Sequence, residues 1–150
     1  MTAGSASDWL STLRLYLAAS AGLHLVWESA HLPLYTIWRG GSFGQKAFAV
    51  LHCTAGDVMI AGFTLLAALL LLGSRTWPAE RAIPVAAAAI VFGVAYAVYS
   101  EWVNTRVRHT WAYSDLMPVV PGIGTGLSPI LQWLVVPPLA LGTAMRRARR

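Results

Sequence analysis

Hydrophobic residues are gathered along the chain into four long runs, separated by short segments that contain glycine, proline or charged residues. The runs predict helices at about residues 10–38, 47–72, 83–104 and 127–144. Each run reaches or approaches the roughly 20 residues that cross a hydrocarbon layer of about 30 Å. Because backbone polar groups cannot stay unpaired in lipid, the runs are expected to cross it as helices. The pattern predicts an all-α fold, an integral membrane four-helix bundle.

The composition strengthens this prediction. Hydrophobic residues make up 57% of the chain and charged residues only 11%, whereas roughly a quarter of a water-soluble domain is charged. The sequence has no internal repeat and no low-complexity linker, so residues 1–150 are expected to form a single transmembrane domain. The first nine residues carry no basic residue, and the apolar run behind them is too long for a signal peptide, so the first span is expected to remain in the mature protein.

Basic residues lie mainly at the ends of the apolar runs, which is typical of a membrane protein and argues against a nucleic-acid partner for this chain of net charge +5. The side holding both termini and the 73–81 loop carries seven of them: Arg14, Arg75, Arg81, Arg146, Arg147, Arg149 and Arg150. The other side carries four: Arg39, Lys46, Arg106 and Arg108. This bias predicts a multi-pass protein of the cell inner membrane with both termini cytoplasmic and the lipid bilayer as its partner.

Ionisable side chains inside the predicted spans are candidate functional groups, because each costs several kcal/mol in lipid unless it is paired or hydrated. His24, Glu28 and His31 stand at i, i+4 and i+7 and share one face of the first helix. Counted along the helices, His24 lies about 14 Å and Asp57 about 15 Å deep. These two side chains are therefore expected to pair near the midplane, or to share a water or a metal.

The remaining titratable groups fall in the outer half of the bundle. Glu28, His31, His52 and Glu101 are expected to line one cavity with His24 at its floor, because consecutive antiparallel helices usually pack side by side. The segment between the third and fourth helices is too polar to span and rich in Trp and Tyr. It is predicted to be an outer-side capping loop over this cavity, or alternatively a connector on the membrane surface.

Candidate roles follow from residue type. The candidate catalytic carboxylates are Glu28, Asp57 and Glu101; the candidate metal ligands are His24, His31, His52 and His109; and the candidate cofactor-binding residues are Asn104, Arg108, Trp111 and Tyr113. The structural alternatives are buried or interfacial pairs: His24 with Asp57, Glu28 with His31, and Glu101 with Arg106 or Arg108. The lone cysteine, Cys53, excludes an internal disulfide and a cysteine-cluster metal site.

The spacing of His24 and Glu28, together with Glu101 near the end of the third helix, loosely resembles the emopamil-binding-protein class of sterol isomerases. That resemblance implies a small polytopic helical protein with His and Glu in a lipid-accessible cavity. The segment from Trp111 to Gln132 departs from that class. The Ser-Glu-Trp segment at 100–102 and the Leu-Ser-Pro segment at 127–129 are similar to those of uncharacterised small bacterial membrane proteins, and this similarity carries no function.

Three functions remain open from the sequence. The first is a site for a transition metal, haem or a small lipophilic ligand, since neutral imidazole is the commonest ligand of several metals. The second is an acid-base enzyme, isomerase-like, acting on a lipophilic substrate. The third is a non-catalytic accessory subunit in a homo- or hetero-oligomer. Glu28-Ser29-Ala30-His31 is one copy of the Glu-x-x-His pairing that di-iron bundles use twice, and the sequence has no second copy.

Overall fold

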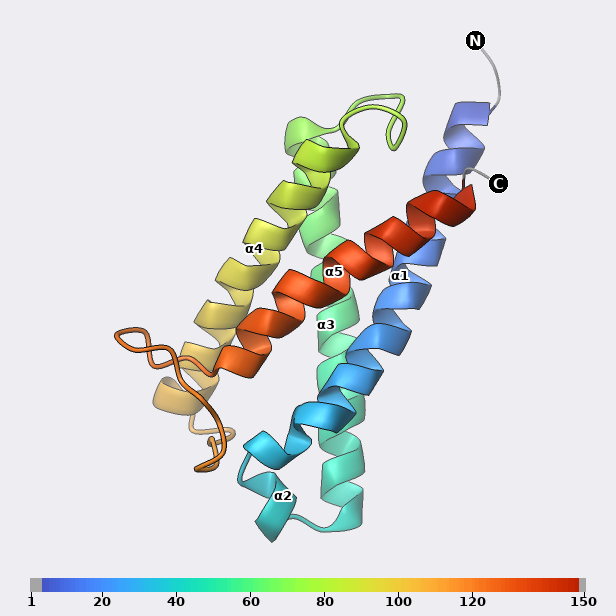
Figure 1. Ribbon diagram of the computed structural model, residues 1–150. Coiled ribbons are helices and arrows are strands. Elements are labelled where there is room, and N and C mark those ends of the chain that lie inside the picture. Colours follow the sequence, from blue (N-terminus) through green and yellow to red (C-terminus); the bar gives the residue numbers. More distant parts are fainter. Residues whose placement is uncertain (1–3, 149–150) are drawn as a thin grey trace.

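The computed structural model describes residues 4–148, with side chains for residues 9–147, and this part of the chain contains helices and no strand. The four long helices are α1 (Gly4–His31), α3 (Phe43–Leu72), α4 (Ala82–Trp102) and α5 (Leu127–Ala148). Three short elements complete the described chain: η1 (Leu32–Leu34), α2 (Ile37–Gly40) and η2 (Val103–Val107), of which η2 is a π-helical turn. α1 packs against α3 and α5, and α4 packs against the same two helices (Figure 1). The predicted all-α class is confirmed.

The first helix ends earlier than the apolar run predicts. α1 stops at His31 rather than near residue 38, and the chain turns through η1 and α2 before α3 begins. Pro33 lies in the first turn of η1, where its missing N–H and fixed φ end the α-helix. α3 then starts with a capping box, in which Gln45 N donates to Ser42 Oγ at 3.3 Å and Ser42 N donates to Gln45 Oε1 at 2.8 Å.

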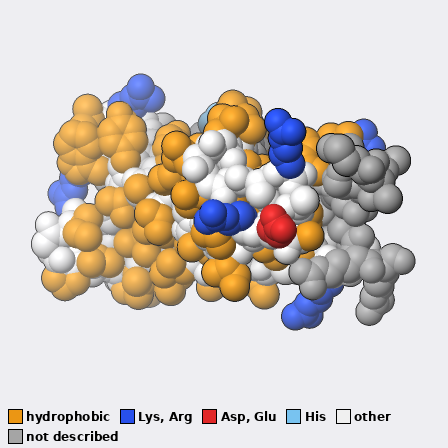
Figure 2. Space-filling model, turned by 90° about the horizontal axis from the view of Figure 1, so that it is seen from above, with side chains coloured by type: hydrophobic (Ala, Val, Ile, Leu, Met, Phe, Trp, Pro, Cys, Tyr) orange, Lys and Arg blue, Asp and Glu red, His pale blue; other side chains and the backbone are white. Residues whose placement is uncertain are grey.

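Three helices in the described part of the chain are long and apolar enough to cross a membrane: α3, α4 continued by η2, and most of α5. α1 is not one of them, so the sequence prediction of four apolar spans is met for three. The three helices expose most of their apolar residues, since only 17% of the most apolar stretch of α3 and 22% of that of α4 is buried. Seen from above, toward the end that holds the termini, hydrophobic side chains also cover much of the surface, with basic groups and an acidic group between them (Figure 2).

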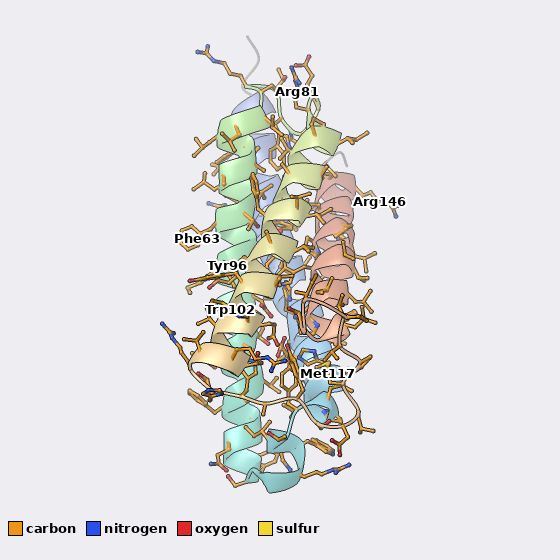
Figure 3. All side chains as sticks on the ribbon, turned by 90° about the vertical axis from the view of Figure 1, so that its left-hand side faces the viewer. Phe63, Arg81, Tyr96, Trp102, Met117 and Arg146 are labelled. Carbon is orange, nitrogen blue, oxygen red and sulfur yellow. The ribbon has the colours of Figure 1, made fainter. Side chains whose placement is uncertain are left out.

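The outward-facing side chains of α3 and α4 are large and apolar. Phe43 is 87% exposed and Ile83 83% exposed, and Figure 3 shows Phe63 and Tyr96 projecting from these two helices. A soluble monomer rarely exposes so large an apolar area. This surface is suited to contact with lipid.

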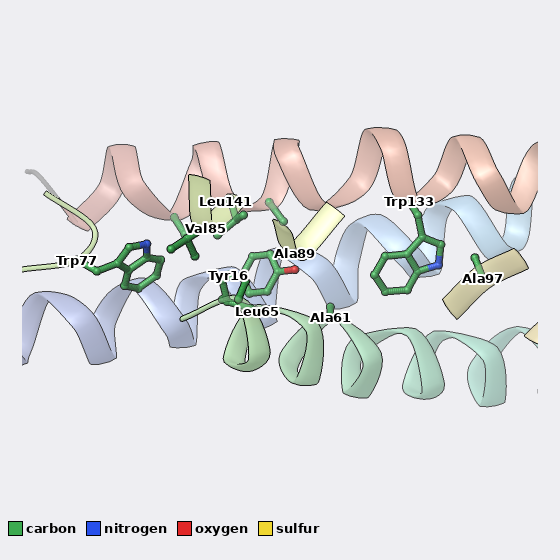
Figure 4. Packing of buried hydrophobic residues seen from close by; sticks show 12 residues of the cluster. Tyr16, Ala61, Leu65, Trp77, Val85, Ala89, Ala97, Trp133 and Leu141 are labelled. Carbon is green, nitrogen blue, oxygen red and sulfur yellow. The ribbon is translucent and has the colours of Figure 1, made fainter. Parts of the chain in front are cut away.

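Small residues fill the places where the helices meet, as Figure 4 shows for Ala61, Ala89 and Ala97. Among the side chains that the structure describes, the buried alanines are Ala61, Ala68, Ala89, Ala97, Ala140 and Ala144. Small side chains let helix backbones approach closely, which is how membrane helices gain packing energy. The closest approach is at Gly93 of α4, where a Cβ would lie 2.1 Å from Cε3 of Trp133. Gly93 therefore allows the Trp133 ring to lie directly against the α4 backbone.

The two ends of the described chain lie at one end of the molecule, together with the segment that connects α3 to α4 (Figure 1). The predicted orientation requires this arrangement. It rests on counting the basic residues of the termini and of the 73–81 loop on the same side of the bundle. Which face of a membrane this end occupies stays a prediction.

Candidate functional site

A cavity of about 1010 Å³ lies where α1 ends, between the first half of α3 and the last turns of α4. It brings together four side chains predicted to share an outer-half cavity: Glu28, His31, His52 and Glu101. Asp57 and Arg108 also line it, so three carboxyl groups face one space with a single guanidinium. The rest of the wall is largely aromatic and aliphatic, with residues such as Ile60, Tyr96 and Trp133. An apolar cavity with a few convergent polar groups is the usual form of a small-molecule site.

Gln132 of α5, which lines the cavity, is the centre of a group of polar side chains. Its amide nitrogen lies 2.9 Å from one atom on each of three side chains: His24 Nδ1, Glu28 Oε1 and Asp57 Oδ2. The expected approach of His24 and Asp57 is confirmed, because His24 Nδ1 lies 3.4 Å from Asp57 Oδ2. Gln132 thus joins α5 to side chains of α1 and α3.

The hydrogen bonds around Gln132 can be completed by neutral groups and carboxylates. A primary amide has two N–H donors, which can go to Glu28 Oε1 and Asp57 Oδ2. A neutral His24 with its ring proton on Nδ1 is itself a donor, and Asp57 Oδ2 lies 3.4 Å from it. The arrangement therefore places one imidazole beside two carboxyl groups, all of which can take up and release protons.

The end of α1 carries a second, linked set of contacts. His31 Nε2 lies 3.1 Å from Glu28 Oε2, and His31 Nδ1 lies 3.0 Å from Ser128 Oγ. Ser128 Oγ also accepts a hydrogen bond from Trp27 Nε1 at 3.2 Å. The predicted pair of Glu28 and His31 is present, and both ring nitrogens of His31 have protein partners.

Glu101 is held by the segment that follows α4. The Tyr113 hydroxyl donates to Glu101 Oε2 and accepts from the backbone N–H of Gly126 at 2.9 Å. Burial and the hydrogen bond to the Glu101 carboxylate raise the pKa of Tyr113, so its phenol stays protonated and remains a donor. In the part of the chain that the structure describes, no ion pair joins Glu101 to Arg106 or Arg108, so that structural alternative was wrong.

The same segment is fastened to the turn after α1. Thr36 N donates to Ala112 O at 3.0 Å and Ser114 N donates to Leu34 O at 2.9 Å. Ser114 Oγ donates to Pro33 O at 3.1 Å. Two chain segments about 80 residues apart in sequence are thereby joined at the mouth of the cavity.

Several predicted positions differ from the structure. His24 does not line the cavity: it is fully buried behind Asp57 and Gln132, with its ring 5.4 Å from that of Trp133. The reason is that Gln132 and Trp133 of α5, which do line the cavity, pack against the His24 ring. Tyr113 contacts Glu101 but is not a wall residue, whereas the other predicted cofactor-binding residues do line the cavity: Asn104, Arg108 and Trp111.

The four histidines do not converge. His52 stacks on Phe48 with ring centroids 5.3 Å apart, and His109 is an exposed loop residue with a left-handed φ of 51°. Across residues 4–148, no group of three or more His, Cys, Asp or Glu side chains is placed to hold a metal ion. The predicted metal-ligand set His24, His31, His52 and His109 is therefore not assembled, because these side chains face different partners.

Sequence reasoning missed Gln132 and Ser128, since it searched the spans for ionisable groups and both of these are neutral. The signal that could have found Gln132 is an amide side chain inside an apolar helix. Such an amide needs hydrogen-bond partners when it is buried, as a buried charge does. It also missed the polar residues Thr12, Tyr16 and Ser20, which precede His24 at four-residue intervals.

Comparisons of the chain with protein-family models, with curated proteins and with solved structures find no match. The similarity to the emopamil-binding-protein class and to small bacterial membrane proteins stays a prediction.

Proposed function

We propose that this protein is a four-helix membrane protein that binds a small lipophilic molecule in the cavity between α1, α3 and α4. One observation carries the proposal: the cavity joins three carboxyl groups from three different helices to aromatic and aliphatic side chains such as Ile60, Tyr96 and Trp133. The apolar wall suits the body of a lipophilic molecule, and the carboxyl groups of Glu28, Asp57 and Glu101 suit a polar group that donates hydrogen bonds.

In this proposal α1 is the fourth span, although it is not among the helices that are long and apolar enough to cross a membrane by themselves. Its buried polar side chains, among them His24 and Glu28, contact groups of α3 and α5 rather than lipid, which a bundle of helices can accommodate. The 103–126 segment caps the outer mouth through Arg108 and Trp111, and both termini are cytoplasmic.

A lipophilic ligand fits the donor set better than a metal or haem. Both ring nitrogens of His31 are engaged by Glu28 and Ser128, and across the described residues no group of three His, Cys, Asp or Glu side chains is placed to hold a metal ion. Imidazoles committed to protein partners are poor ligands for an iron or zinc ion.

An acid-base enzyme acting on the same lipophilic molecule is the second candidate function. The observation in its favour is that Gln132 joins one imidazole and two carboxyl groups, those of His24, Glu28 and Asp57. A proton held beside an apolar cavity could be given to, or taken from, a bound substrate.

The test blocks the cavity without disturbing the helix. Gly56 lines the cavity, and a Cβ added there meets no atom within 4 Å, so Gly56→Leu places an apolar side chain in the binding space. Gly142→Leu is the matched control, because Gly142 also lies in a helix with open space around its Cβ but outside the cavity. Both changes gain helix propensity.

The measurement is mass spectrometry of organic extracts from the purified protein. We expect a stoichiometric lipophilic compound with the wild type and with Gly142→Leu, and its loss with Gly56→Leu. Equal amounts in all three proteins would contradict the proposal. An empty wild type that is stable only within a larger complex would favour the accessory subunit instead.

A further inference from the structure

A column of polar side chains runs along the buried face of α1. It begins at the cavity and leads toward the opposite end of the bundle. It has one member in every turn, at four-residue intervals: Thr12, Tyr16, Ser20, His24 and Glu28. The first four are 0% exposed and Glu28 is 8% exposed. Residues at i and i+4 lie one above the other on a helix, so the five side chains form a continuous line.

The middle of this column is incompletely hydrogen-bonded by protein. Among the described residues, no hydrogen bond of good geometry reaches Tyr16 Oη, Ser20 Oγ or His24 Nε2. The Ser20 hydroxyl is nevertheless close enough to Tyr16 to influence its ionisation. Three such atoms in consecutive turns are unusual, because an unsatisfied buried polar group costs about 1–3 kcal/mol. Their spacing suits single water molecules between neighbouring side chains.

The column is nearly as long as the hydrocarbon core of a membrane is thick. From Thr12 to Glu28 it rises about 24 Å along α1, against about 30 Å for a hydrocarbon core. One end meets the cavity, where Glu28 is a wall residue. The other end lies toward the termini and the 73–81 loop (Figure 1).

The side-chain chemistry suits protons. Hydroxyl groups both donate and accept hydrogen bonds, and imidazole and carboxyl groups take up and release protons. The titratable groups facing the column at its cavity end are Asp57 from α3 and His31 from α1, and Gln132 of α5 bonds there as well. Buried ionisable groups in membrane helices commonly form such relays.

We propose that the α1 column is a proton path that connects the cavity to the opposite face of the membrane. A proton entering at Glu28, Asp57 or His24 is passed along Ser20 and Tyr16 by successive hydrogen-bond exchange, and one proton leaves near Thr12. The charge moved is balanced by a counter-ion that crosses the membrane separately. This inference rests on the proposed membrane placement, but not on the identity of the ligand.

The test uses the full chain reconstituted in liposomes that contain a trapped pH-sensitive dye, with potassium and valinomycin to clamp the potential. A pH step then reports proton flux. We expect the wild type to exceed protein-free liposomes, and Ser20→Ala to fall to the protein-free rate. Ser29→Ala is the matched control, because Ser29 is exposed on the other face of α1 and donates to Leu25 O at 2.8 Å. It should conduct like the wild type.

A second pair of variants guards against a folding defect. Tyr16→Phe removes only the buried hydroxyl and should abolish flux, whereas Tyr99→Phe changes a tyrosine that is 60% exposed and should leave flux unchanged. Wild-type flux no greater than that of protein-free liposomes overturns the proposal, as do Ser20→Ala and Tyr16→Phe proteins that conduct normally.

Ligand retention by Ser20→Ala is measured in parallel, since Ser20 does not line the cavity. A ligand kept without wild-type flux refutes the path alone, and flux without a ligand refutes the binding function alone.

Discussion

Replacing Gln132 with leucine tests the buried network most directly. The change keeps an apolar helix position filled and removes the amide nitrogen that lies 2.9 Å from His24, Glu28 and Asp57. The three acceptors would keep only their contacts with one another and with His31. Since Gln132 and Glu28 are buried, water cannot easily replace the lost donors.

The expected cost follows from the two N–H groups that are removed. Each buried acceptor left without its donor costs about 1–3 kcal/mol, so Gln132→Leu should lower the free energy of unfolding by about 2–5 kcal/mol. That is a large part of a stability of about 5–15 kcal/mol, yet it leaves the protein folded under mild conditions. Thr143→Val on the same helix is the control. Thr143 is exposed and donates only to Leu139 O, so its replacement should change stability by no more than about 0.5 kcal/mol.

A double-mutant cycle separates this network from a general loss of packing. Glu28→Gln places a new amide beside the remaining acceptors, so it should partly compensate for the loss of Gln132. The measurement is the free energy of unfolding in mixed detergent micelles for the two single variants and the double variant. We expect a coupling energy of at least about 1 kcal/mol, within the range found for contacting groups. Effects that add within about 0.5 kcal/mol would refute the reasoning, because the two side chains would then act independently.

Three further predictions concern packing, the loop histidine and topology. Gly93→Ala should destabilise the protein by about 1–3 kcal/mol, because its Cβ would overlap the Trp133 ring; thermal denaturation against Gly142→Ala checks this, and equal melting temperatures would contradict it. His109→Gly should keep any bound species and gain up to about 1 kcal/mol of stability, because glycine adopts the left-handed φ of 51° without strain; loss of the bound species would instead make His109 a ligand. Reporter fusions after residue 150 and in the 73–81 loop should both be cytoplasmic, and a cytoplasmic signal from the 39–46 segment would reverse the orientation.

Part of the architecture follows from the sequence alone. The apolar runs predict the positions of α3, α4 and α5, because a segment that must bury its backbone in lipid has to be helical and about 20 residues long. Residue spacing places Glu28 and His31 on one face, and depth along the helices brings His24 level with Asp57. These are properties of single helices, and the structure reproduces them.

Tertiary structure decided how the helices are rotated and what their polar groups meet. Periodicity relates residues within one helix, but the angle that a helix presents to its neighbours depends on packing, here on close contacts such as that of Gly93 with Trp133. The packing of α5 against α1 covers His24 with Gln132 and Trp133 instead of leaving it at the floor of the cavity. It also brings Gln132 of α5 to three acceptors on α1 and α3, and the fold of the 103–126 segment brings Tyr113 to Glu101. Because the contacts of Gln132 join helices far apart in sequence, no single run of residues contains the information that determines them.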